Sequence, residues 1–224
     1  MVSTARAIPH RVSVREVRIP LSTVQLRGDL ALPVGAQGLV IFAHGSGSGR
    51  KSPRNRHVAD VLHKHNLATL LADLLTEDEE TLDRQIAHLR FDIPLLAGRL
   101  AGIGEWAWHQ AELRELDCGY FGASTGAAAA LMAAAGEYRI RAIVSRGGRP
   151  DLAGAMLPRI NAPVLLLVGA RDSEVLKLNE RALRVLNAES RLEVIPRASH
   201  LFEEAGTLEA VAQRAAAWFA QHLG

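Results

Sequence analysis

The sequence has little that would mark a secreted, metal-binding or membrane-spanning protein. Its one cysteine, Cys118, cannot form an internal disulfide and has no second cysteine with which to hold a metal. The longest apolar runs, such as residues 39–43 and 164–169, are far shorter than the ~20 residues that a membrane span needs. The first 19 residues contain scattered charges and no apolar leader. We therefore expect a cytoplasmic protein without a transmembrane segment, a metal or a cofactor.

Aromatic residues and excess charge are also scarce. Aromatic residues make up 4% of the chain and the formal net charge is +2, so neither base stacking nor a strongly basic surface is available for nucleic acid. One basic run stands out, and we expect it to be a solvated loop in preference to an anion site: Arg50, Lys51, Arg54 and Arg56. These features argue against a nucleic-acid partner.

The chain has the length and composition of one globular domain. Its 224 residues, 48% of them hydrophobic, are enough for a single α/β unit spanning 1–224. Residues 12–33 form two alternating apolar and polar runs separated by Pro20 and Ser22, which predicts an antiparallel hairpin.

From residue 38 onward, short apolar runs alternate with helical patterns, which is typical of parallel strands covered by crossover helices. The predicted strands are 39–43, 68–72, 118–122, 142–145, 164–168 and 192–195. The predicted helices begin near Arg54, Glu79, Thr125, Leu152, Ser173 and Thr207. The pattern predicts helices on both faces of a mainly parallel sheet. It leaves no room for a large cap domain, so any lid comes from loops or from residues 76–116.

The segment Gly122-Ala123-Ser124-Thr125-Gly126 lies between a predicted apolar strand and an alanine-rich helix. In a G-x-S-x-G nucleophile elbow, the serine occupies a strained turn, and the glycines let neighbouring backbone approach closely. A serine hydroxyl is a weak nucleophile unless a base accepts its proton. The segment therefore predicts Ser124 as a nucleophile, provided that a base lies nearby.

The base and its acidic partner are predicted from chain order and from strand ends. The elbow fold supplies its groups in the order serine, acid, histidine. Asp172 follows the predicted strand 164–168, and His200 follows 192–195, so both reach the edge of the sheet where Ser124 lies. Glu174 and Asp151 remain alternatives for the acid. Seven other histidines are expected to be surface or packing residues: His10, His57, His63, His65, His88, His109 and His222.

Acyl transfer also needs donors for a developing oxyanion. We expect one donor to be the Thr125 backbone N–H, and the other to be the Ser46 N–H in the loop that follows the first parallel strand, with Gly47 as the alternative. The glycines of this loop match neither G-x-x-x-x-G-K-[ST] nor G-x-G-x-x-G, which argues against a phosphate-cradling loop.

Together these motifs resemble the α/β-hydrolase superfamily, and within it the small, capless dienelactone-hydrolase-like branch. The resemblance extends from about Gly38 to the C-terminus and implies the same triad and oxyanion donors. The chain departs from dienelactone hydrolases proper, which have a cysteine at the elbow where this chain has Ser124. Cys118 lies six residues before Ser124 in a predicted strand, where a small core residue is expected. The departure leaves dienelactone itself doubtful as the substrate.

The sequence thus predicts a carboxylic ester hydrolase acting on a small ester or lactone. A thioesterase, peptidase or acyltransferase with the same triad is an alternative, and so is a non-catalytic binding protein on this scaffold. Arg146 follows a predicted strand at the same sheet edge. It could hold a substrate carboxylate or phosphate, although pairing with an acidic neighbour is the competing interpretation.

Overall fold

The computed structural model describes residues 11–224, so His10 lies outside it. These residues form an eight-stranded sheet in the order β1-β2-β4-β3-β5-β6-β7-β8. Strand β2 pairs antiparallel with β1 and β4, and the pairs from β4 to β8 are parallel. The strands are β1 Val12–Pro20, β2 Gln25–Pro33, β3 Gly38–Ala43, β4 Leu67–Ala72, β5 Asp117–Ala123, β6 Ile140–Arg146, β7 Val164–Gly169 and β8 Ser190–Ile195. The predicted hairpin and parallel sheet are confirmed.

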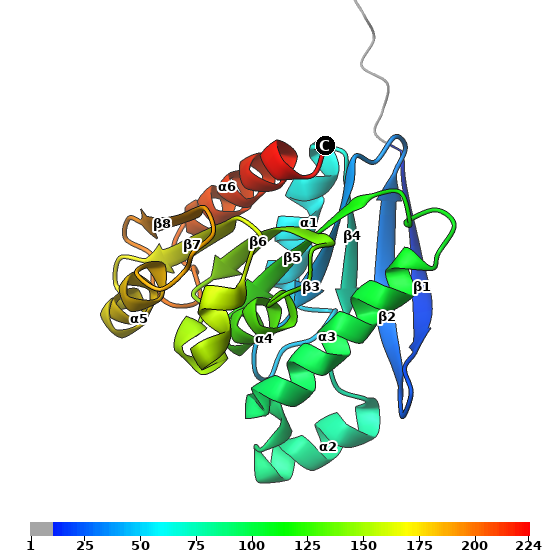
Figure 1. Cartoon of the computed structure of the whole chain (residues 1–224), viewed down its shortest axis with the longest axis horizontal. Coiled ribbons are helices and arrows are strands. Elements are labelled where there is room, and N and C mark those ends of the chain that lie inside the picture. Colours follow the sequence, from blue (N-terminus) through cyan, green and yellow to red (C-terminus); the bar gives the residue numbers. More distant parts are fainter. Residues whose placement is uncertain (1–10) are drawn as a thin grey trace, which may run out of the picture.

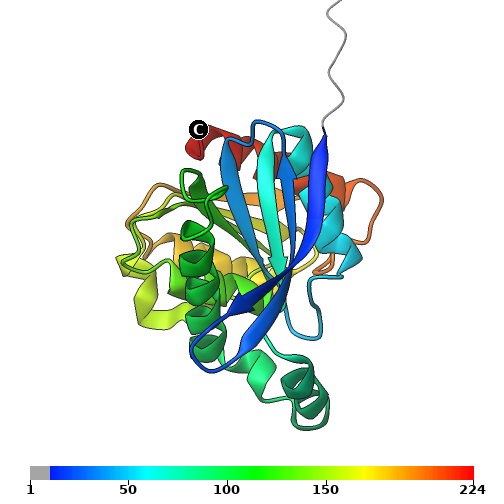
Figure 2. The same cartoon turned by 90° about the vertical axis from the view of Figure 1, so that its right-hand side faces the viewer.

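Helices cover both faces of the sheet, as predicted (Figures 1 and 2). On one face lie α1 Pro53–Lys64 and α6 Thr207–His222, whose apolar sides pack together with alternate residues of the central strands. On the other lie α3 Ile93–Trp108, α4 Thr125–Ala133 and α5 Ser173–Leu183. None of the helices in residues 11–224 is long and apolar enough to cross a membrane. The predicted central strands are apolar throughout because helices bury them on both sides.

One predicted helix is wrong in type. The segment expected to be helical from near Leu152 is a 3-10 helix, η2 Pro150–Arg159. Gly154 interrupts it with φ 51° and ψ −126°, and Pro158 has no N–H to donate. These two residues prevent the continuous hydrogen bonding of an α-helix, so η2 is a compact connection from β6 to β7.

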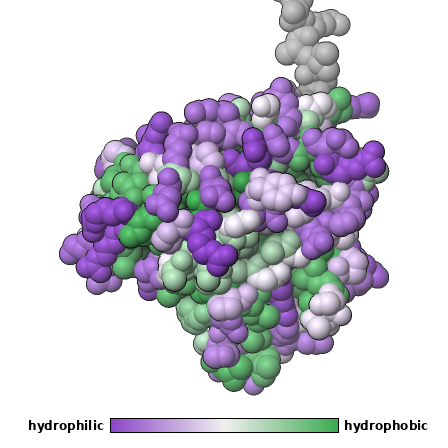
Figure 3. All heavy atoms as spheres, viewed as in Figure 1, coloured by the Kyte–Doolittle hydropathy of each residue, from purple (hydrophilic) through white to green (hydrophobic). Residues whose placement is uncertain are grey.

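The interval 76–116 is mostly part of the core. Helix α3 packs against α4, and only α2 Glu77–Ile86 and η1 Leu89–Phe91 project from the sheet (Figure 2). We call α2 with η1 the arm. Leu82, Ile86 and Phe91 of the arm are about half exposed, and Figure 3 shows apolar surface at this end of the molecule.

A buried arginine attaches the arm to the core. Arg99 of α3 donates from Nη1 to Leu74 O at 2.7 Å and to Glu79 Oε2 at 2.6 Å, and its Nη2 donates to the other Glu79 oxygen. Hydrogen bonding by Arg99 lowers the pKa of Glu79. Thr76 caps α2 and forms a capping box with Glu79. Glu79 therefore joins the start of the arm to α3.

Replacing Arg99 by leucine should loosen this attachment. The substitution removes the hydrogen bonds from Arg99 to Leu74 O and to Glu79, so the free energy of unfolding should fall by about 1–3 kcal/mol in urea titrations. Limited proteolysis should cut faster between residues 77 and 91. Arg84→Leu, on the exposed side of α2, is the matched control and should change stability by less than about 0.5 kcal/mol. Equal effects of the two substitutions would contradict the assignment.

Candidate active site

Ser124 stands at the junction between β5 and α4 in a strained backbone conformation. Its φ is 52° and its ψ is −119°, a combination rare for a residue with a side chain. The following helix comes so close to the loop after β3 that a Cβ on Gly126 would lie 2.2 Å from Ala43 O. The sharp turn leaves the Ser124 side chain half-buried at the carboxyl end of β5.

His200 and Asp172 form a hydrogen-bonded pair at the same edge of the sheet. The His200 Nδ1 to Asp172 Oδ2 distance is 2.6 Å. Asp172 lies between β7 and α5 and its side chain is 14% exposed, whereas that of His200 is 39% exposed. Of the rival acids, Asp151 accepts two hydrogen bonds from Arg149, and Glu174 is exposed in the first turn of α5. The imidazole is thus oriented by Asp172 and still open to solvent.

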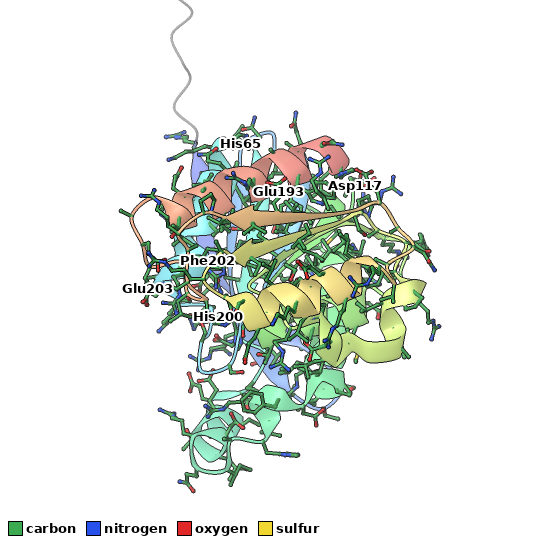
Figure 4. The ribbon with its side chains drawn as sticks, turned by 90° about the vertical axis from the view of Figure 1, so that its left-hand side faces the viewer. His65, Asp117, Glu193, His200, Phe202 and Glu203 are labelled. Carbon is green, nitrogen blue, oxygen red and sulfur yellow. The ribbon has the colours of Figure 1, made fainter. Side chains whose placement is uncertain are left out.

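Ser124 follows β5 and His200 follows β8, and the end of β6 lies between them. The Ser124 N–H donates to Arg146 O at 3.1 Å, and a Cβ built on Gly147 would be 3.5 Å from His200 Cε1. Figure 4 shows His200, Phe202 and Glu203 in one loop, far from Asp117 at the start of β5. Within residues 11–224, no hydrogen bond joins the Ser124 hydroxyl to His200. Hydrogen bonds between catalytic groups are often long before they tighten around a substrate.

The loop after β3 is tied to the elbow through hydroxyl groups. The Ser46 N–H donates to Thr125 Oγ1 at 3.0 Å, and the two hydroxyl oxygens are 2.9 Å apart. The Thr125 N–H is at the first position of α4, where a helix has no acceptor of its own. A substrate oxygen that used both predicted N–H donors would therefore have to replace Thr125 Oγ1 at Ser46. Gly47, the alternative donor, lies at φ 67° in the same loop.

His44 anchors this loop, a role that the sequence analysis did not predict. It is 8% exposed; its Nε2 accepts the Leu74 N–H at 2.9 Å, and its Nδ1 lies 3.1 Å from Gly45 O. Burial lowers the pKa of His44, which agrees with a neutral ring that accepts at Nε2 and donates at Nδ1. The only feature of the sequence that could have indicated this role is the position of His44 directly before the predicted oxyanion loop.

Arg146 is buried without the acidic partner that the competing interpretation required. The residue is 9% exposed, and its guanidinium carbon lies 5.9 Å from the centre of the Phe121 ring. Among residues 11–224 its side chain makes no hydrogen bond or ion pair, and its Nη1 is buried and unpartnered. Burial and the nearby Arg54 lower the pKa of Arg146 to about 10, so it remains charged at neutral pH.

A cavity of about 590 Å³ adjoins the elbow at Thr125. It is lined by the loop after β3, by Thr125 and Arg54, and by the arm residues Glu77, Glu80 and Arg90. The basic run was expected to be solvated, but this holds only in part. Arg50 is 5% exposed and is paired with Glu16 and Asp73. Its partners were unpredictable because they lie far away in the sequence, Glu16 in β1 and Asp73 directly after β4.

Other candidate groups are not assembled for chemistry. Cys118 is 1% exposed, and burial raises its thiol pKa far above the usual range. Within residues 11–224, no three His, Cys, Asp or Glu side chains come together in the way that a metal site needs.

The buried His44 should make stability depend on pH. Because its pKa is lower in the folded than in the unfolded chain, its contribution is present above about pH 6.5 and is lost as the pH falls below that value. Denaturant titrations from pH 7.5 to 5 should show a shallower loss in His44→Gln than in the unchanged chain. His63, whose pKa burial also lowers, should account for part of the remaining slope. The exposed control His109→Gln should keep the original slope, and an unchanged slope in His44→Gln would refute the proposed origin.

Comparison with known proteins places this geometry in a family. No family model matches the chain. A dienelactone hydrolase from Anabaena variabilis is 54% identical with a TM-score of 0.94, and the match covers 96% of this chain and 100% of that one. Est1E from Butyrivibrio proteoclasticus shares the fold at 17% identity, with a TM-score of 0.76 and coverage of 92% and 98%. A dienelactone hydrolase-like promiscuous phosphotriesterase from metagenomic libraries does so at 18% identity, with a TM-score of 0.74 and coverage of 95% and 99%.

Two Mycobacterium tuberculosis proteins are 53% identical over 209 residues, or 93% of this chain. Their names suggest a phosphoribosyl transferase, and the chain spans 46% of their length. The Anabaena protein, in contrast, matches over its full length. On that match the chain belongs to the dienelactone-hydrolase-like branch of the α/β-hydrolases.

Proposed function

We propose that the chain is a serine hydrolase that cleaves a small carboxylic ester or lactone through an acyl-enzyme on Ser124. The observation that carries the proposal is the strained Ser124 elbow at one strand end, beside a His200–Asp172 pair at 2.6 Å. The dienelactone hydrolase and esterase names of similar structures support the same reaction class. We further propose that one cytoplasmic domain, residues 1–224, carries these groups without a cofactor.

In the first step, His200 Nε2 accepts the Ser124 proton as Oγ attacks the substrate carbonyl carbon. Asp172 accepts the Nδ1 hydrogen bond, which keeps Nε2 available as a base and stabilises the imidazolium that forms. His200 then gives the proton to the leaving alcohol. In the second step, His200 takes a proton from a water molecule as that water attacks the acyl carbon. The acyl–Oγ bond then breaks, His200 returns the proton to Ser124 Oγ, and the acid is released.

The proposed oxyanion donors are the N–H groups of Ser46 and Thr125. The Thr125 N–H lies at the amino end of α4, where the helix dipole favours negative charge. The Ser46 N–H donates to Thr125 Oγ1 at 3.0 Å. We infer that the substrate carbonyl oxygen replaces this hydroxyl as the acceptor of the Ser46 N–H. The loop that His44 holds would then form the oxyanion site together with Thr125.

The acyl acceptor and leaving group are open within this mechanism. A thioesterase, peptidase or acyltransferase could use the same residues. Rates on an ester, a thioester and an anilide of one acyl group would separate these activities, and we expect the ester to react fastest. The phosphoribosyl transferase name of the M. tuberculosis relatives is not carried over, because this chain spans 46% of their length.

A non-catalytic binding protein is the alternative from another class. It would use the cavity beside the elbow and have no need of an oriented histidine. Ser124→Ala decides between the two: under our proposal it should lower the turnover of a simple aryl ester by at least about 10⁴-fold. The variant should still bind the ester, because the Ser124 hydroxyl acts in the chemical step and adds little to substrate binding. Activity that survives the substitution would refute Ser124 as the nucleophile.

The acid can be tested separately from the nucleophile. Asp172→Asn should lower kcat by roughly 10³- to 10⁴-fold, because an amide no longer fixes the productive tautomer of His200. Glu174→Gln and Asp151→Asn are matched controls that remove the two rival carboxylates, and both should retain most of the activity. A larger loss in either control than in Asp172→Asn would reassign the acid.

A further inference from the structure

The buried arginine at the end of β6 has the surroundings of a binding group that lacks its ligand. Arg146 pairs in register with Ala123, the residue directly before Ser124, so the two strands place it beside the elbow. Its side chain packs over Phe121 on the face of the sheet that α1 and α6 cover. A buried charge without a partner is strongly destabilising. Two acids at this edge of the sheet have other partners: Asp172 is bonded to His200, and Asp151 to Arg149.

A second guanidinium lies close by. Arg54, at the second residue of α1, lines the cavity beside the elbow, and its Nε is buried and unpartnered among residues 11–224. Its positive charge is near enough to depress the pKa of Arg146. In the described part of the chain its one ion-pair partner is Glu203, whose side chain is 65% exposed and lies 3.6 Å from Nη1, beyond hydrogen-bond range. Figure 4 shows Glu203 in the His200 loop. Both arginines therefore border the His200 loop: Arg54 lies 3.6 Å from Glu203, and a Cβ on Gly147, the residue after Arg146, would lie 3.3 Å from His200 O.

We propose that Arg54 and Arg146 bind a phosphate group, which a ligand presents beside Ser124. Two guanidiniums offer more donors than one carboxylate can accept, because a single arginine already binds both oxygens of a carboxylate. A phosphate brings a charge near −2 and three accepting oxygens, which match two cations on separate elements. The amino end of α1 adds a favourable dipole at the position of Arg54.

For the reaction, the site implies an ester or lactone substrate that carries a phosphate away from its scissile bond. This part of the inference rests on the proposed hydrolase function. The binding of phosphate does not, because neither arginine belongs to the proposed triad. The two claims can therefore fail independently.

Inorganic phosphate is the probe for the site itself, with binding measured by calorimetry on the full chain. We expect saturable binding that Arg146→Met weakens by roughly 10- to 100-fold, as expected for lost hydrogen bonds to a charged group. Arg54→Gln should weaken it similarly, and because Arg54 is partly exposed this variant guards against misfolding of Arg146→Met. Arg141→Gln is the matched control, an exposed arginine on the same strand, and should bind as before.

Phosphate binding that both arginine variants retain would overturn the site. Acetate binding as tightly as phosphate would overturn the preference for a dianion. Ser124→Ala should bind phosphate normally, which separates this result from a failure of the proposed nucleophile.

The place of the site in the reaction is tested by inhibition. Phosphate should compete with a neutral aryl ester in the unchanged chain and should no longer do so in Arg146→Met. Binding without competition would overturn the claim that the phosphate lies in the substrate site. Hydrolysis that persists in Ser124→Ala would remove the proposed nucleophile and leave the arginine site standing.

Discussion

The backbone turn at Ser124 is the constraint on which the other features of the site depend. Its φ of 52° costs on the order of 1–3 kcal/mol and persists because the surrounding chain leaves no other path. A Cβ on Gly122 would lie 2.4 Å from Ala127 Cα, so only glycine lets α4 turn back so close to β5. This turn directs one hydroxyl out of a sheet whose neighbouring strands are otherwise buried. It also brings the start of α4 against the loop after β3.

The buried arginines of the molecule differ in the partners that their guanidinium groups have. Three arginines in the described residues are buried: Arg50, Arg99 and Arg146. Arg50 and Arg99 meet carboxylates that hold the loop after β3 and the arm in place. Arg146 meets the Phe121 ring and another cation. The first two are explained by the fold alone, whereas the third fits the phosphate site that we propose.

The parts of the molecule that were predictable are those encoded locally. Apolar runs locate the parallel strands to within two residues, because each strand is long enough to be recognised and is buried by helices. The segment around Ser124 predicts the turn, because the close backbone approach in such a turn requires glycine two residues before and two residues after the serine. Chain order then brings Asp172 and His200 to the same edge of the sheet.

The remaining features depend on contacts between distant residues. The Leu74 N–H that His44 accepts is 30 residues away, and the Thr125 hydroxyl that engages Ser46 is 79 residues away. Arg146 has no acidic partner among the described residues because of how distant segments pack around it, and the sequence near Arg146 does not reveal this. The helix predicted near Leu152 was wrong because Gly154 takes a positive φ that composition alone does not reveal.

Covalent labelling with a fluorophosphonate tests whether Ser124 is an activated nucleophile. Such a reagent reacts with a serine only where a base activates it and an oxyanion site stabilises the adduct. Peptide mass spectrometry of the labelled chain should find one adduct, on Ser124. An unlabelled chain, or an adduct on a different serine, would contradict the account.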